Sequence, residues 1–318
     1  MMDPMIKTSL KEDYAENGYL LLKNFIPKYS IDEYNFIVER ARLNLQLTKN
    51  RIGGLHLAEP SLLDLVNTKK LLPILQMCLD DEPSLFNSLN FEYGTSQGTH
   101  VDCQFFYPCP EHSMIGVWIA LEEVTDKNGP LFIYKKSHKL KVLHSEELAK
   151  VNSEFNEARN AIIHGGNKSK IAELGVMYGD TLIDRIESEG FERKAFASLN
   201  PGDVVIWHSS LAHGGSAVMN PIMTRKSAVF HFFGKSAKLF DHNAFLLEPK
   251  LELTSTDSVK DYKREFMHIN GLAVQKFKTF VIFCTYIQNT YLWFNVFIYS
   301  CKITIAHNSK LKKICQFQ

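Results

Sequence analysis

The chain has 318 residues, of which 45% are hydrophobic and 22% charged, enough for one large core with a smaller appendage. Its 36 basic and 35 acidic residues leave a net charge of +1 without a basic stripe, so we expect no nucleic-acid partner. The six cysteines form no CxxC pair and the N-terminus has no apolar signal segment, so we expect a reduced, cytoplasmic protein.

The pattern over residues 1–85 predicts a mainly helical N-terminal region with one short strand. Residues 17–22 contain an apolar run after a glycine, which predicts the strand. Residues 30–33 have the Ser-Ile-Asp-Glu pattern of a capping box, so a helix should begin there and continue to about residue 48. A second apolar helical pattern spans residues 62–79 and should pack beside the first helix.

From residue 86 onward strand-forming residues dominate, and the segment Gly-Thr-His-Val-Asp at 98–102 carries the first chemical signal. Residues i and i+2 face the same side of an extended strand, so His100 and Asp102 can bind one ion together. Cys103 then points to the opposite face, and we interpret it as a core residue. Two histidines and one carboxylate are the ligands of an iron(II) site that keeps positions open for substrate and oxygen.

A polar stretch interrupts the strand pattern and predicts a helical insert at about residues 145–197, too long for a turn. In a barrel enzyme such an insert would lie at the open end. It either caps the substrate and sets selectivity, or is a solvated insert without substrate contact. Its basic residues either bind an anionic group or belong to a solvated charged face. These residues are Lys168, Lys170, Arg185 and Arg193.

Two further strands are predicted at residues 203–208 and 226–233, joined by a segment rich in glycine and serine. This segment contains His213 in the context Ala-His-Gly, and we interpret it as the third metal ligand. His208 is the competing candidate, but it ends a strand, so we favour His213. The remaining histidines of the barrel region are interpreted as structural or surface residues: His138, His231 and His242.

Arg225 stands at the start of the second of these strands, twelve residues after His213. An inward-facing guanidinium is costly unless an anion meets it. The co-substrate 2-oxoglutarate supplies such an anion, because its distal carboxylate can accept two parallel hydrogen bonds from arginine. The alternatives are a surface arginine or an ion pair with an acid such as Asp203.

At this point the chain resembles the phytanoyl-CoA dioxygenase family of iron(II)- and 2-oxoglutarate-dependent oxygenases, over roughly Glu12 to His242. The chain departs from the family pattern at Lys135-Lys136, where a Pro-Gly turn is usual, which affects a loop and no ligand. The matching segments, in the family's order, are residues 98–102, Gly-Val-Trp-Ile-Ala-Leu-Glu-Glu-Val at 116–124, Asn-Gly-Pro-Leu at 128–131, Ser-His-Lys at 137–139, and Pro-Gly-Asp-Val-Val at 201–205 leading to His213 and Arg225.

The resemblance implies a mainly β fold with helices, a double-stranded β-helix (jelly-roll, cupin-like barrel). It implies a dioxygenase that hydroxylates a small organic substrate with O2, while 2-oxoglutarate is decarboxylated to succinate and carbon dioxide. Related halogenases replace the acid of the metal motif by a small residue, so Asp102 favours hydroxylation. The residue roles implied by similarity are Fe(II) binding by His100, Asp102 and His213, and 2-oxoglutarate binding by Arg225, Trp118 and Ser216.

Two other classes of protein stay open. A zinc hydrolase can use the same ligand types, but a histidine-rich ligand helix is missing from the sequence and Arg225 would be unexplained. A cupin-like metal- or ligand-binding protein without turnover would keep the same ligands.

The last segment, residues 276–318, is an apolar tail of unclear status. Residues 279–299 lack charge and are long enough to span a bilayer, but Gln288, Asn289 and Asn295 would be costly there. A membrane anchor is therefore a minority interpretation beside an extension packed on the barrel and a sequence foreign to the domain. The expected division is a helical buttress (1–85), a β-helix domain with its insert (86–275) and this tail.

Overall fold

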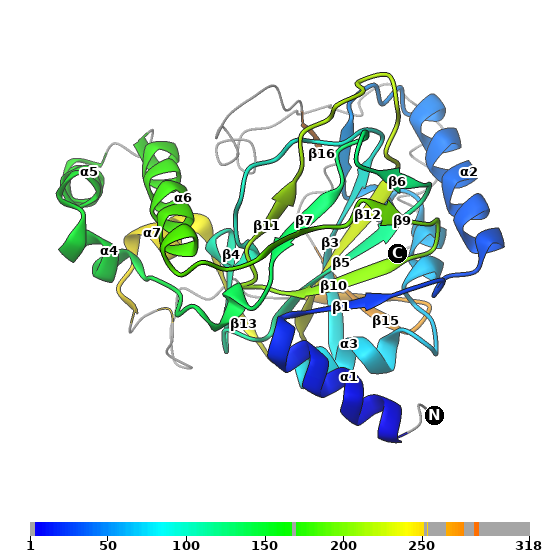
Figure 1. Cartoon of the computed structure of the whole chain (residues 1–318), viewed down its shortest axis with the longest axis horizontal. Coiled ribbons are helices and arrows are strands. Elements are labelled where there is room, and N and C mark those ends of the chain that lie inside the picture. Colours follow the sequence, from blue (N-terminus) through cyan, green and yellow to red (C-terminus); the bar gives the residue numbers. More distant parts are fainter. Residues whose placement is uncertain (1–3, 167–169, 251–252, 254–264, 277–282, 286–318) are drawn as a thin grey trace.

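The computed structural model describes residues 4–166, 170–250, 253, 265–276 and 283–285. Within these residues the chain forms a double-stranded β-helix, with one large, mostly antiparallel sheet facing smaller ones and helices outside them (Figure 1). The fold predicted from the sequence is therefore confirmed.

The large sheet supplies the rigid frame of the barrel. Its alternating residues form two cores, because successive side chains in a strand point to opposite faces. In β12, for example, Phe230 and Phe232 face the outer core while Val229 faces the inner one. The strand order is β1 (Tyr19–Leu22), β10 (Val204–His208), β5 (Met114–Ala120), β12 (Ser227–Gly234), β3 (Pro83–Phe91), β15 (Leu272–Gln275) and β14 (Phe266–Ile269), with β2 (Arg51–Gly53) on β3 and β16 (Phe283–Thr285) on β2.

Three smaller sheets complete the barrel. The predicted strands at 17–22, 203–208 and 226–233 correspond to β1, β10 and β12 of the large sheet, so those predictions are confirmed. The first of the smaller sheets has the order β11 (His213–Gly215), β7 (Leu131–Tyr134) and β8 (Arg193–Ala195). The other two pair β13 (Lys238–Asp241) with β4 (Phe106–Cys109), and β6 (Val124–Thr125) with β9 (Ser198–Leu199).

N-terminal helices cover the outer face of the large sheet: α1 (Pro4–Asn17), α2 (Lys28–Asn44) and α3 (Leu72–Leu79). The capping box expected at Ser30 is wrong, because α2 begins earlier, after Pro27, without a side-chain cap. The single helix expected over 62–79 is also wrong. It is divided into a 3₁₀-helix, η2 (Pro60–Leu65), and α3, which carries a proline in its first turn, where proline is tolerated. A further 3₁₀-helix, η1 (Leu55–Leu57), precedes them.

The insert is helical, as predicted, with α4 (Ser145–Val151), α5 (Ser153–Gly165) and α6 (Ile171–Ser188). Figure 1 shows these helices grouped with α7 (His242–Leu247) on the side of the barrel away from α2. Their apolar faces share one core with Val101, Cys103 and Ala212, which flank the predicted metal ligands. The insert thus supports the ligand-bearing segments from behind.

The expected domain division remains a prediction, and the structure adds that β1 and β2 of the first 85 residues belong to the large sheet. Most of the tail, including nearly all of 279–299, lies outside the described residues, and so does Lys168 of the insert. Among the helices that are described, none has the length and apolarity needed to cross a membrane.

Candidate metal centre

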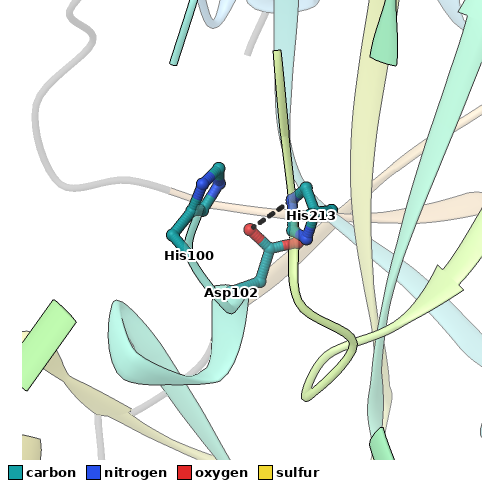
Figure 2. A group of neighbouring side chains, drawn as sticks. All are labelled: His100, Asp102 and His213. Atoms are coloured by element: carbon teal, nitrogen blue, oxygen red, sulfur yellow. Dashed lines mark ion pairs between the residues drawn. The ribbon is translucent and has the colours of Figure 1, made fainter. Parts of the chain in front are cut away.

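The two predicted histidine ligands lie on paired backbone segments. His100 forms a single antiparallel bridge with His213, the first residue of β11. The strand expected over 98–102 is reduced to this bridge, because Asp102 already begins a 3₁₀-helix, η3 (Asp102–Gln104). Val101 between them is extended, which is sufficient to place His100 and Asp102 on one side. Figure 2 shows the three side chains close together, with a dashed line that marks the ion pair between Asp102 and His213.

The ligand atoms of these residues fit one metal ion. One donor atom from each of His100, Asp102 and His213 lies within 4.8 Å of the others, and Nε2 of His213 is 3.7 Å from Oδ1 of Asp102. The Nδ1 atoms of the histidines lie 2.9 Å from the carbonyl oxygens of Gly98 and Leu211. A carbonyl only accepts, so each Nδ1 carries the proton and each Nε2 keeps its lone pair for a metal.

The electrostatics also suit metal binding. Burial, aided by His213, lowers the pKa of His100 to about 3, so its imidazole is neutral. Burial alone would raise the pKa of the Asp102 carboxyl, but His213, His231, His100 and the Trp207 hydrogen bond together hold it below its ordinary value. The neutral imidazole of His100 and the ionised carboxylate of Asp102 are in the protonation states that metal ligands need.

Two neighbours of Asp102 were not anticipated from the sequence. The indole Nε1 of Trp207 donates a hydrogen bond of 2.8 Å to Oδ2 of Asp102. Nε2 of His231 lies 3.7 Å from the same oxygen, so His231 is a buried neighbour of the site and not a surface residue. The available signal for His231 was its even spacing from Arg225, because residues at even spacing in an extended segment point to the same side.

Arg225 is 4% exposed, and its Nε has no hydrogen-bond partner within the described part of the chain. Its guanidinium carbon lies 5.5 Å from the ring centre of Trp118 and 5.9 Å from that of Phe91. Burial lowers the pKa of Arg225 to about 10, with Glu122 opposing the shift, so the side chain stays charged at neutral pH. A buried guanidinium with an unused donor fits a carboxylate ligand.

The alternatives for Arg225 find no support. It is not a surface residue, and the carboxylate of Asp203 is engaged elsewhere, with Lys23 Nζ at 2.5 Å. Ser227, the first residue of β12 and two residues after Arg225, also has a buried hydroxyl without a partner in the described region. Arg225 and Ser227 therefore each offer a buried donor without a partner, as a bound carboxylate requires.

The structure separates some predicted residues from this centre. Ser216 follows β11, and its hydroxyl accepts a hydrogen bond of 3.1 Å from Arg193 rather than from a residue of the metal group. Its role in 2-oxoglutarate binding remains a prediction. His208 packs against the rings of Tyr14 and His138, so the structure brings His213, and not His208, to the other two ligands.

Two further polar side chains near the site had no sequence signal. The amide nitrogen of Gln97 lies 2.9 Å from Nε2 and 3.1 Å from Nδ1 of His100, so it contacts this ring. Arg51 of the three-residue strand β2 is buried against Phe91, 5.6 Å from its ring centre. Burial lowers the pKa of Arg51 to about 9, and the charge of Asp102 partly restores it. The centre therefore has a positive surrounding that favours anionic ligands.

A double-stranded β-helix with two histidines, an aspartate and a buried arginine on its inner side defines the class of non-heme iron, 2-oxoglutarate-dependent oxygenases. The sequence model of the phytanoyl-CoA dioxygenase (PhyH) family matches residues 14–227. The chain belongs to this family.

Curated relatives carry the same family name. A probable phytanoyl-CoA dioxygenase of Caenorhabditis elegans is 24% identical over 240 residues, covering 64% of this chain and 68% of the relative. A phytanoyl-CoA dioxygenase domain-containing protein 1 homolog of Caenorhabditis briggsae is 34% identical over 95 residues, 28% of this chain and 33% of that protein. The latter match spans only a third of its relative.

Solved structures show the same fold at low sequence identity. The alpha ketoglutarate-dependent epimerase SnoN from nogalamycin biosynthesis superposes with a TM-score of 0.60 at 14% identity, covering 86% of this chain and 96% of SnoN. EctD from S. alaskensis, with 2-oxoglutarate and 5-hydroxyectoine, gives a TM-score of 0.51 at 16% identity over 78% of this chain and 84% of EctD. These similarities establish the fold of the chain.

Proposed function

We propose that this protein is an iron(II)- and 2-oxoglutarate-dependent dioxygenase that hydroxylates a small organic substrate and releases succinate and carbon dioxide from the co-substrate. The observation that carries the proposal is the convergence of His100, Asp102 and His213 within 4.8 Å, together with the buried side chain of Arg225, whose Nε has no hydrogen-bond partner in the described part of the chain. A ligand cluster alone is compatible with many metals. The arginine adds a binding group for the distal carboxylate of 2-oxoglutarate.

In this proposal each residue has a separate task. His100, Asp102 and His213 would hold the metal and leave positions open. Arg225, whose guanidinium carbon lies 5.5 Å from the ring centre of Trp118, would bind the distal carboxylate of 2-oxoglutarate. When bound, the iron and its co-substrate supply the oxidising chemistry. The chain supplies a dry surrounding, since all three ligands are buried, and this limits reaction with water in place of substrate.

The reaction outcome is part of the proposal. Asp102 occupies the position that related halogenases leave open for halide, which favours hydroxylation over halogenation. SnoN is described as an epimerase, and SnoK, at a TM-score of 0.53 and 14% identity, as a carbocyclase. The same fold therefore accommodates other outcomes of substrate oxidation, and the products must be identified chemically.

The decisive experiment loads the full chain anaerobically with iron(II) and titrates 2-oxoglutarate while recording the weak visible charge-transfer band of an iron–2-oxoacid chelate. A saturable band that disappears in Arg225→Ala at the same co-substrate concentration supports the proposal. Metal binding without a band at any concentration contradicts it and favours a zinc-type or other metal chemistry. A band with no oxygen-dependent succinate, across a broad substrate screen, would favour the cupin-like binding protein without turnover.

A further inference from the structure

We propose that Trp207 is a positioning residue of the metal centre, whose indole contacts both Asp102 and His213 and fixes their positions. We further propose that a glycine at position 116 is needed to leave space for this indole. This inference rests on the metal site proposed above. Nothing in the sequence motif His-Val-Asp indicates which residue orients the carboxylate, so the assignment comes from the structure.

The two oxygens of Asp102 have different neighbours. Oδ1 faces Nε2 of His213 at 3.7 Å, on the side where the ligand atoms converge. Oδ2 accepts the indole N–H of Trp207 at 2.8 Å. A carboxylate that accepts a strong hydrogen bond on one oxygen presents the other to a metal, so Trp207 favours binding of the metal through Oδ1 alone.

The same indole supports a second ligand. Its ring centre lies 4.6 Å from that of His213, with an angle of 41° between the ring planes. Trp207 is 2% exposed and packs in the inner core, so its position is fixed by surrounding residues. One rigid side chain therefore contacts two of the three ligands, and a change in its position would move both.

Gly116 explains how a tryptophan fits at this point. Gly116 lies in β5 directly opposite Trp207 of β10 and, on its other side, opposite His231 of β12. A β-carbon on residue 116 would lie 2.2 Å from Cε2 of the indole and 2.6 Å from its Nε1. The missing side chain thus leaves the space in which the Trp207 indole reaches over β5 toward Oδ2 of Asp102, the oxygen that His231 also approaches.

The test measures metal binding on the full chain, with Co(II) as the probe in place of iron(II). Affinity is obtained by competition with a metal indicator, and the visible d–d spectrum of bound Co(II) reports ligand geometry independently of activity. Trp207→Phe keeps a ring but removes the donor, and Gly116→Ala displaces the indole. Both should weaken Co(II) binding by about 10- to 100-fold and alter the spectrum, because loss of a residue that hydrogen-bonds to a metal ligand has effects of this size.

A second substitution separates hydrogen bonding from packing. Replacing Trp207 by benzothienylalanine, in which sulfur replaces the indole N–H, keeps the bicyclic shape. This variant should fold like the wild type yet show the weaker binding and altered spectrum of Trp207→Phe. Phe196→Leu is the matched control, because Phe196 is buried in the same core without contacting a ligand. It should lose stability and keep Co(II) affinity.

The outcomes distinguish this inference from the proposed function. If His100→Ala lowers Co(II) affinity while the benzothienylalanine protein binds with wild-type affinity and spectrum, the metal site stands and the positioning role of Trp207 is wrong. If His100→Ala and the wild type bind Co(II) equally, the metal site itself is wrong, and the inference falls with it.

Discussion

The main chains of His100 and His213 are hydrogen-bonded to each other in both directions, N–H of each to the carbonyl of the other, at 2.9 Å. Their rings lie 4.3 Å apart between centres. Because the bonds involve only backbone atoms, they do not depend on the imidazoles or on a metal. The site is therefore organised by the fold before any ion binds.

The first prediction follows from this backbone pairing. His100→Ala and Asp102→Ala should reduce retained iron to background while the far-ultraviolet circular dichroism spectrum stays that of the wild type. Iron would be measured by atomic emission after desalting, and thermal unfolding would be recorded to confirm that each variant is folded. Unchanged iron in both variants would remove the assignment of the metal site.

The second prediction concerns Arg225. Arg225→Ala should keep iron and weaken 2-oxoglutarate binding by about 2–5 kcal/mol, because a charged two-point contact to a desolvated carboxylate is lost. Anaerobic titration of the charge-transfer band gives the affinity. Lys226→Ala is the control, since this neighbouring lysine pairs with Glu39 away from the inner face. Equal effects of both changes would mean that general electrostatics, and not a specific contact, binds the co-substrate.

The third prediction concerns the buried carboxylate of Asp203, which ends the turn before β10. It accepts hydrogen bonds from Lys23 Nζ and from the backbone N–H groups of Asn24 and Asn200. Asp203→Ala removes the buried acceptor of these donors and should destabilise the protein by about 1–3 kcal/mol, less than for a fully buried ion pair because the Lys23 side chain is 43% exposed. Urea unfolding at neutral pH measures the change, and a loss below about 1 kcal/mol would contradict it.

The fourth prediction is a loss of stability in mild acid. His56 is fully buried, with Nδ1 2.7 Å from Oγ of Ser88, and burial lowers its pKa from 6.5 to about 4. Below pH 6.5 His56 becomes protonated in the unfolded chain, whereas in the folded protein it stays neutral down to about pH 4. Stability contributed by neutral His56 is thus complete above pH 6.5 and is lost as pH falls through this window.

Between pH 7 and pH 5 the loss from His56 should be about 2 kcal/mol. His56→Gln cannot titrate and should show a correspondingly shallower decline in the free energy of unfolding than the wild type. Metal-free protein is used for both, so that metal release does not contribute. Parallel pH profiles for the two proteins would show that His56 is not responsible.

Several elements followed directly from local sequence. Alternating apolar residues and turn signals marked β1, β10 and β12, and the start of α4 at Ser145 was visible from its polar first turn. Helix boundaries set by competition between local signals were less predictable. The pattern at Ser30–Glu33 looked like a cap, but α2 begins at Lys28, directly after the extended N-cap residue Pro27, and no side chain caps it.

The sequence by itself determined the residue types of the proposed ligands, their spacing and the presence of an arginine after His213. Only the tertiary structure decided which residues orient those ligands. Trp207, Gly116 and His231 lie on three different strands, and they form one row because β5 pairs with β10 and β12 in a particular register. Strand register is set by burial of whole faces and by long-range pairing, so residues distant in sequence become neighbours through contacts that no local pattern encodes.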